Sequence, residues 1–147
     1  MAEENAALDA TDRAILGVLA TDARITWRDL GTEVGLSANA AAERVRRLER
    51  LGVVRGYQAD IDPEAVGRPL EGYVMVKMHP GDDRVLFRAY VAEHPAIVDA
   101  VHLTGPHDYI MHVRCTNTTE LDDILMTVKR EAGVADTETR IVLHRVE

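Results

Sequence analysis

The sequence predicts an α+β protein, in which an N-terminal three-helix domain of the winged helix-turn-helix type precedes a ferredoxin-like βαββαβ domain. The first observation behind this prediction is that apolar residues recur at helical spacing up to Gly52. The second is that, from Leu70 onward, segments that alternate apolar and polar residues take turns with helical segments. The predicted boundaries are residues 1–52 for the helical domain, 53–69 for a connector strand and hinge, and 70–147 for the βαββαβ domain.

The composition limits the class of protein. The chain has 147 residues, of which 46% are hydrophobic, so a disordered chain is excluded and two small domains are possible. Each would be marginal alone, which favours association of subunits. No apolar run approaches the about 20 residues of a membrane span, and the acidic N-terminus lacks the pattern of a secretory signal. Cys115 is the only cysteine, which suits a reducing compartment. We therefore expect a cytoplasmic protein without contact to a membrane.

Three helices are predicted in the N-terminal domain. The first should run to about residue 21, the second should open near residue 26, and the third should follow a short turn. The residues expected to cap or end these helices are Asp9 or Thr11, Thr26, Gly35, Ser37 and Gly52. A helix, a short Gly-Leu turn and a serine-capped basic helix together form the pattern of a helix-turn-helix.

The third helix carries a local positive charge on an acidic chain. The net charge is −8, which alone argues against nucleic acid. Between Ser37 and Gly56, however, five arginines and two glutamates give +3, so the other 127 residues carry −11. Helical spacing places Ala41, Val45 and Leu48 in a buried stripe. The residues on the opposite face are Asn39, Glu43, Arg46 and Arg50, with Arg44 and Arg47 on a flank.

This arrangement suits DNA, because small residues keep the front of the third helix slim enough for a major groove. Asparagine suits adenine, arginine suits guanine or phosphate, and the start of the second helix attracts phosphate. The predicted DNA-binding residues are Thr26, Trp27, Arg28, Ser37, Asn39, Arg44, Arg46, Arg47 and Arg50. Purely structural roles stay open for three of them: Ser37 as a helix cap, Trp27 as a packing residue, and Arg44 as the partner of an internal acid.

The C-terminal domain should contain four strands and two helices, with the helices on one face of an antiparallel sheet. A turn at Gly105-Pro106-His107 should separate the second and third strands, and Gly133 should end the second helix. Thr118 or Thr119 is the expected cap of that helix. The predicted strands are residues 70–78, 97–104, 108–116 and 137–146, and the predicted helices are residues 82–94 and about 118–131.

Several stretches in the right order make the chain similar to a known family. They are LDATDRAIL, DARITWRDLG, VGLSANAAAERVRRLERLGVVRGYQADIDPEAVG, VHLTGPHDY and GVADTETRIVLHRV. From Leu8 to Val146 the chain resembles the Lrp/AsnC, or feast/famine, regulators. The resemblance implies transcription regulation, DNA sites of two-fold character, dimers formed through the C-terminal domain, and assembly of dimers into tetramers or octamers. It also implies an amino-acid effector, held in a cleft between dimers by the loop that matches LTGPHDY and the start of the last strand.

The loop has chemistry that suits such an effector. Free backbone N–H groups near Gly105 and His107 can hold a carboxylate, and Asp108 can hold an ammonium group. Pro106 removes one such donor, and the alternative is that the loop is only a hairpin turn that Asp108 fixes. The predicted effector-binding residues are Leu103, Thr104, Gly105, His107, Asp108, Tyr109, Asp136, Thr137 and Thr139.

Two alternative functions remain. Siroheme decarboxylases look similar to this family, but no nucleophile–base pair stands out in the sequence. A stand-alone effector or assembly protein without DNA binding would fit the acidic total charge. The six histidines show no metal-binding spacing, so we expect no metal and no cofactor besides the effector.

Overall fold

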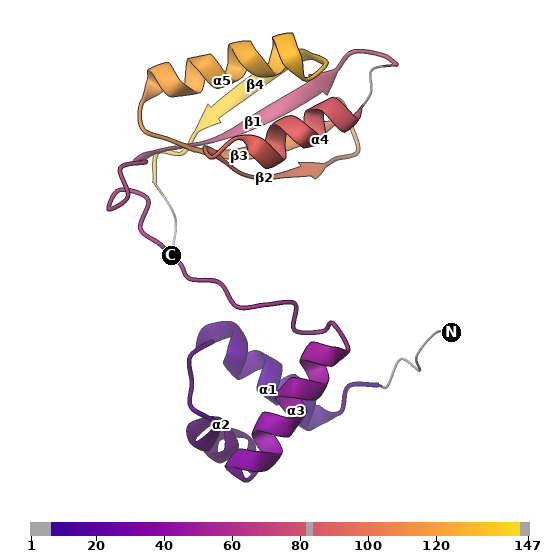
Figure 1. Ribbon diagram of the computed structural model, residues 1–147, viewed down its shortest axis with the longest axis vertical. Helices are drawn as coiled ribbons and strands as arrows, with labels where there is room; N and C mark the ends of the chain where they lie inside the picture. The colour runs from indigo at the N-terminus through magenta and orange to yellow at the C-terminus, as the bar shows by residue number, and fades with distance from the viewer. Residues whose placement is uncertain (1–6, 82–83, 145–147) are drawn as a thin grey trace. The chain divides into compact units, whose positions relative to one another are not determined.

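The structure is a computed structural model that describes residues 7–81 and 84–144. The chain divides into two compact units, Met1–Asp60 and Ile61–Glu147, and the division falls inside the segment expected as a connector. Figure 1 shows helices alone in the first unit, and a sheet with two helices in the second. Within the described ranges, no helix is both long and apolar enough to cross a bilayer.

The first unit is built from α1 (Ala10–Thr21), α2 (Trp27–Val34) and α3 (Ala38–Arg50). Their apolar faces meet in a core of fully buried side chains. The fully buried members of this core are Ile15, Leu30, Ala41, Val45 and Leu48. The three helices, and the caps at Asp9, Thr26 and Ser37, therefore confirm the predicted helical domain.

The connector differs from its prediction. No strand lies among the described residues of the first unit, so neither a wing nor a connector strand is present there. Residues 55–62 have no regular secondary structure, and a turn follows at 63–67. The apolar residues of this segment resemble those of a strand, but a strand also needs a neighbour to accept its backbone hydrogen bonds. The described chain offers it none.

The second unit is a four-stranded antiparallel sheet of order β2-β3-β1-β4. Two helices pack on it, and their buried residues join those of the strands in one core. The elements are β1 (Leu70–Met78), α4 (Arg84–Glu93), β2 (Ile97–His102), β3 (Tyr109–Cys115), α5 (Thr118–Glu131) and β4 (Val134–Ile141). The predicted βαββαβ order is confirmed, with both helices on the face that carries Val74 and Val76 (Figure 1).

Two local predictions in this unit are wrong. The cap of α5 is Asn117, whose side-chain oxygen accepts the backbone N–H of Glu120 at 3.0 Å, rather than Thr118 or Thr119. The last strand runs Val134–Ile141 rather than 137–146, because a bulge at Lys77/Met78 lets its first residues pair with the end of β1. Residue 146 lies outside the described residues.

Candidate functional site

The turn between α2 and α3 packs closely against α2. Gly35 ends α2 in the left-handed conformation, with φ of 70°, and the backbone N–H of Leu36 donates to the carbonyl of Gly31 at 2.7 Å. A Cβ atom placed on Gly31 would lie 2.6 Å from the Leu36 carbonyl oxygen. The turn and α2 therefore touch backbone to backbone. Ser37 then caps α3 by accepting the N–H of Ala40 at 3.2 Å.

The two faces of α3 differ as the helical spacing predicts. Its inner face, with Ala41, Ala42, Val45 and Leu48, is buried. The opposite face is exposed and carries Asn39, Glu43, Arg46 and Arg50. Among these, Glu43 lies 3.2 Å from a guanidinium nitrogen of Arg46 and 3.8 Å from one of Arg50. The polar face is therefore presented to solvent with its charges partly neutralised.

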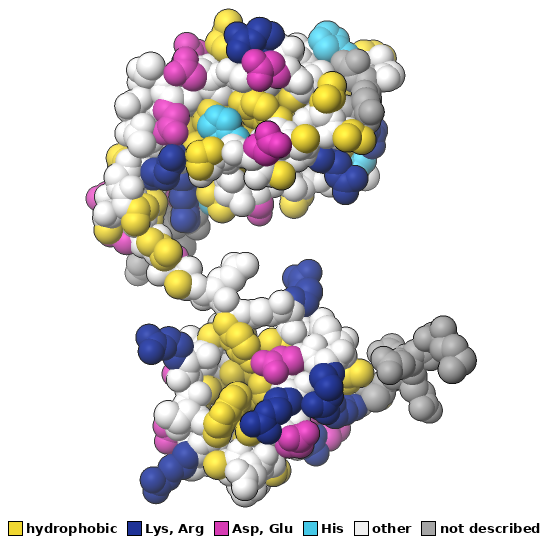
Figure 2. Space-filling view, viewed as in Figure 1, with side chains coloured by type: hydrophobic (Ala, Val, Ile, Leu, Met, Phe, Trp, Pro, Cys, Tyr) yellow, Lys and Arg dark blue, Asp and Glu magenta, His cyan; other side chains and the backbone are white. Residues whose placement is uncertain are grey.

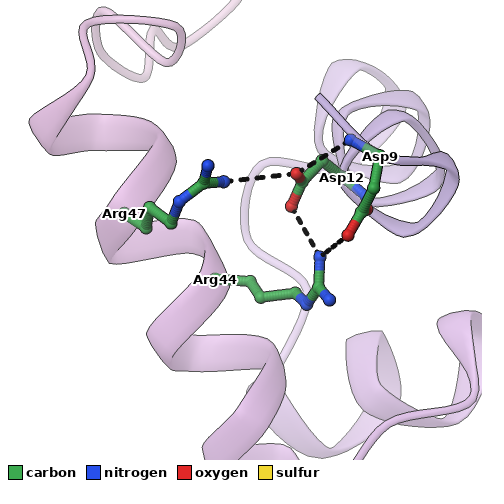
Figure 3. Close-up of polar contacts among 4 residues, drawn as sticks. All are labelled: Asp9, Asp12, Arg44 and Arg47. Atoms are coloured by element: carbon green, nitrogen blue, oxygen red, sulfur yellow. Dashed lines mark hydrogen bonds and ion pairs between the residues drawn. The ribbon is translucent and has the colours of Figure 1, made fainter. Parts of the chain in front are cut away.

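The flank of α3 is tied to the start of α1 by a cluster of ion pairs. Figure 3 shows Arg44 and Arg47 reaching from α3 toward Asp9 and Asp12. Arg44 Nη1 lies 2.6 Å from Asp9 Oδ2 and 2.9 Å from Asp12 Oδ1, while Arg47 Nη1 lies 3.3 Å from Asp12 Oδ2. Asp12 is 1% exposed, and its other contact is the backbone N–H of Asp9. We name these four residues the acid–arginine clamp.

The acid–arginine clamp also lowers the pKa of one of its carboxyl groups. The hydrogen bond from Arg44 to Asp9, aided by the backbone N–H of Asp12, holds the pKa of the Asp9 carboxyl below its ordinary value. Arg44 thus pairs with internal acids, which was the alternative left open by the sequence. The sequence analysis did not single out Asp12, since its partners lie 32 and 35 residues away along the chain.

The side chains at the start of α2 are exposed, whereas most of those in the acid–arginine clamp are partly or fully buried. Trp27 is 43% exposed at the first position of this helix. Arg28 is exposed, and none of the carboxylates in the described chain pairs with it. Thr26 caps the helix by accepting the N–H of Asp29 at 3.1 Å, and its hydroxyl donates to the Asp29 carboxylate at 2.6 Å. Figure 2 shows arginine side chains on the visible face of the helical unit, with acidic side chains among them.

The loop between β2 and β3 holds most of the predicted effector residues. Gly105 has φ of 111°, which favours glycine at this turn. The backbone carbonyl of Asp108 accepts the N–H of Leu103 at 2.8 Å. The backbone N–H of Asp108 donates to the carbonyl of Val76, also at 2.8 Å. His107 Nε2 lies 3.7 Å from a carboxylate oxygen of Glu138. The loop is therefore fastened to the end of β1.

The side chain of Asp108 also binds the end of β1. Its Oδ2 accepts the backbone N–H of Met78 at 2.8 Å and lies 3.4 Å from Lys77 Nζ. The N–H of Met78 and the charge of Lys77 lower the pKa of the Asp108 carboxyl. A structural role for Asp108 is thus present, as the alternative reading of the loop allowed.

The other predicted effector residues do not all point to the loop. Tyr109 is buried, with its ring 4.5 Å from that of Phe87. Asp136 pairs with Lys77 in the sheet register, whereas Thr137 and Thr139 lie on the opposite, helix-covered face of the sheet. Asp136 Oδ1 is 3.4 Å from Lys129 Nζ, and the backbone N–H of Thr137 lowers the pKa of the Asp136 carboxyl.

A pocket of about 420 Å³ lies beside the loop. It joins Asp108 to two cationic side chains that the sequence analysis missed, Lys77 and Arg84. No local pattern in the sequence points to these two residues, because the end of β1 and the start of α4 meet the loop only in the folded chain. Among the described residues, no group of three or more His, Cys, Asp or Glu is placed to hold a metal ion.

Comparison with protein families identifies both units. The model of an AsnC-type helix-turn-helix domain matches residues 8–49, and that of the Lrp/AsnC ligand binding domain matches residues 71–147. The chain belongs to the Lrp/AsnC family. This confirms the resemblance seen in the sequence.

Individual Lrp/AsnC relatives match almost end to end. The regulator LrpA of Mycobacterium tuberculosis is 37% identical over 94% of this chain and 92% of its own length. The regulator FL11 of Pyrococcus horikoshii is 32% identical over 92% of this chain and 89% of its own. A Neisseria meningitidis regulator in complex with L-Met has a TM-score of 0.90 at 32% identity, covering 96% and 93% of the two chains.

These relatives are described as transcriptional regulators and not as enzymes. As an Lrp/AsnC protein, the chain is a DNA-binding transcription regulator with a ligand-binding domain. The decarboxylase alternative therefore finds no support among these matches.

Proposed function

We propose that the exposed face of α3 reads DNA, with Asn39 at base edges and Arg46 and Arg50 at bases or phosphates. The observation that carries this proposal is the segregation of α3 into a buried apolar face and an exposed polar face at the exit of a tight turn. Thr26, Trp27, Arg28 and Ser37 supply phosphate contacts, since backbone N–H groups at the starts of α2 and α3 favour anions. This set includes Arg28 because its guanidinium has no competing carboxylate among the described residues.

Arg44 and Arg47 take a double role in this proposal. Each is about one-third exposed, and each uses one guanidinium nitrogen in the acid–arginine clamp. A guanidinium has five N–H donors, so nitrogens that face solvent can still meet phosphate. The main role of Arg44 is to bind Asp9 and Asp12, and a phosphate contact is secondary.

The test is a salt series of DNA binding. Fluorescence anisotropy with a duplex from the region upstream of the protein's own coding sequence is measured for wild type, Arg46→Ala and Arg28→Ala. Each lost phosphate contact should lower the slope of log K against log salt by about 1. Arg130→Ala, which removes an exposed arginine of α5, is the matched control. Unchanged affinity and slope in both test variants would remove these arginines from the interface, and no binding by wild type would favour a stand-alone effector protein.

The loop pocket is the proposed amino-acid site. It presents Lys77 and Arg84 to a carboxylate and Asp108 to an ammonium group, so its charges complement a zwitterion. Both contacts of the Asp108 carboxylate with Met78 and Lys77 use Oδ2, which leaves Oδ1 for the ligand. The L-methionine complexes of two similar structures, from Neisseria meningitidis and Mycobacterium tuberculosis, support this class of effector. The same loop contains the other predicted contact residues, Leu103, Thr104, Gly105 and His107. Thr137 and Thr139 could contact an effector only from the helix-covered side of the sheet.

A thermal-shift screen with amino acids tests this site. A ligand at 100 times its dissociation constant should stabilise the native state by about 2.7 kcal/mol. Asp108→Asn keeps an oxygen for the N–H of Met78 but removes the charge, and it should abolish the shift. Lys77→Gln should weaken it. A full shift in Asp108→Asn would refute the assignment.

The regulator is further proposed to act as a homodimer that assembles into tetramers or octamers in the cytoplasm. The sheet face opposite the helices carries half-buried Tyr73, Met75 and Ile110 and exposed Val101, which suits a second copy. An effector that binds one assembly better than another shifts the spacing of the paired α3 helices. Light scattering with and without the active amino acid measures this, and an unchanged mass would contradict control through assembly.

A further inference from the structure

A second pocket, on the helix side of the sheet, has a different chemistry from the loop pocket. It encloses about 480 Å³ between α4 and the strands β2 and β3. Arg84 and Arg88 of α4 and His102 of β2 supply its polar groups. The two pockets share Arg84 alone among their described lining residues.

The two arginines of this pocket form no ion pair within the described part of the chain, although the carboxylate of Asp108 interacts electrostatically with Arg84. Arg84 and Arg88 are four residues apart in α4, so their side chains project from the same side of the helix one turn apart. No carboxylate of the described chain forms an ion pair with either of them, and the described residues that line the pocket include no Asp or Glu. Like charges at this spacing destabilise a helix, and a bound anion would relieve their repulsion.

His102 adds a third polar group that already faces Arg84. The guanidinium Nη1 of Arg84 lies 3.3 Å from His102 Nε2. A guanidinium only donates, so this contact is a hydrogen bond only in the tautomer in which His102 Nε2 accepts. An anion that displaces this contact would gain bidentate donation from an arginine, and it would also accept from His102 Nε2 when that nitrogen carries a proton.

The rest of the wall is apolar and partly aromatic. The ring of Tyr109 lies 4.5 Å from that of Phe87 and 4.8 Å from that of His102, and Val91 extends the apolar wall. Aromatic contacts with this wall would stabilise a bound apolar group beyond the contribution of its buried area. A bare inorganic anion would leave this wall unused.

We propose that this pocket binds an organic carboxylate that has an apolar body and no ammonium group, such as a 2-oxo acid. The two arginines hold the carboxylate, and the Phe87–Tyr109 wall holds the body. An amino acid is disfavoured here because its ammonium group would meet cations and no acid. The loop pocket, which adds Asp108 to its cations, has the opposite preference.

Isothermal titration of the full chain with phenylpyruvate, L-phenylalanine and inorganic phosphate tests the proposal. Phenylpyruvate should bind, and Arg88→Gln should weaken it at least about tenfold, equal to the loss of one charge-assisted contact. Any binding of L-phenylalanine should not change in Arg88→Gln. Phosphate should bind more weakly than phenylpyruvate.

Two further variants sharpen the result. Arg130→Gln removes an exposed arginine outside the pocket, and Lys77→Gln alters only the loop pocket, so neither should change the affinity for phenylpyruvate. Arg88 is exposed, so its variant should keep the circular-dichroism spectrum of the wild type.

Three results would each overturn the proposal: no binding of phenylpyruvate, equal binding by wild type and Arg88→Gln, or an L-phenylalanine affinity that depends on Arg88 as strongly. The test does not involve DNA, so its failure is distinct from failure of the DNA-binding proposal.

Discussion

Substitution of Gly31 by alanine probes the packing on which the helix-turn-helix depends. Gly31 lies inside α2, where the turn after the helix passes directly over its Cα. A Cβ atom there would lie 2.6 Å from the carbonyl oxygen of Leu36, and 3.1 and 3.2 Å from the carbonyl carbon and oxygen of Ser37. All three are backbone atoms, so no side-chain rotation relieves the overlap and the turn must move away from α2.

Gly17 in α1 provides a matched control. It is also a helical glycine, and a Cβ there would meet nothing within 4 Å. Both substitutions gain about 0.5–1 kcal/mol from reduced backbone freedom of the unfolded chain. The difference between them therefore isolates the overlap, which by analogy with overpacked cores costs about 1–3 kcal/mol. For a domain of this size, that corresponds to a difference in melting temperature of at least about 4 °C.

Urea denaturation followed by tryptophan fluorescence is the suitable assay. Trp27 is the only tryptophan and begins α2, so the signal reports on the unit that contains the substitution. The free energy of unfolding should be lowest for Gly31→Ala and highest for Gly17→Ala. Gly31→Ala should also weaken DNA binding, because α3 leaves this turn. If Gly31→Ala proved as stable as Gly17→Ala, the close approach of turn and helix would be refuted.

The remaining predictions concern single side chains. Arg44→Ala should lower the free energy of unfolding, because it removes one of the two charged partners of the buried Asp12 carboxylate, while Arg46→Ala removes only an exposed ion pair and should change it much less. Equal effects in chemical denaturation would contradict the clamp. Asn117→Ala should cost about 1 kcal/mol and Thr119→Ala much less, since only the former removes the cap; the reverse order would restore the predicted cap. Backbone and hydroxyl donors hold the pKa of Glu120 below its ordinary 4.5, so its contribution to stability is present above that pH and is lost as pH falls through the folded pKa. Glu120→Gln should therefore flatten the decline of stability below about pH 4.5, and an identical pH profile would show that this carboxylate makes no such contribution.

Features that a few neighbouring residues decide were predictable from the sequence. Thr26 and Ser37 each accept a backbone N–H three residues on, and Gly35 adopts the left-handed conformation that ends a helix. The alternation in residues 70–78 gave β1 its bounds for the same reason. At the start of α5 four consecutive residues, from Thr116 to Thr119, have side chains able to cap, so the local pattern did not select Asn117.

Features that need chain reversal were not predictable from local patterns. Asp108 contacts the N–H of Met78, 30 residues away, and this pairing exists only because β3 and β1 meet in register. The same register places Lys77 beside the loop and Tyr109 on the helix side, while Arg84 reaches the loop pocket from the start of α4. From the sequence alone it could not be seen that Tyr109, Thr137 and Thr139 lie on the helix-covered face of the sheet, and the effector role of the loop stays a prediction.

The acid–arginine clamp changes how the basic charge of α3 should be understood. Counted along the chain, residues 37–56 carry +3, but Asp9 and Asp12 of α1 lie against the flank of α3 and offset two of its arginines. On the outer face of α3, Arg46 and Arg50 in turn share Glu43, so few of the arginines of this helix are free of a nearby carboxylate. A contact surface of so few cations gives weak binding to arbitrary DNA, because nonspecific affinity grows with the number of phosphates neutralised. In the proposed function, affinity would then come from base contacts by residues such as Asn39 and from two copies of α3 binding one site, which makes an acidic total charge compatible with DNA binding.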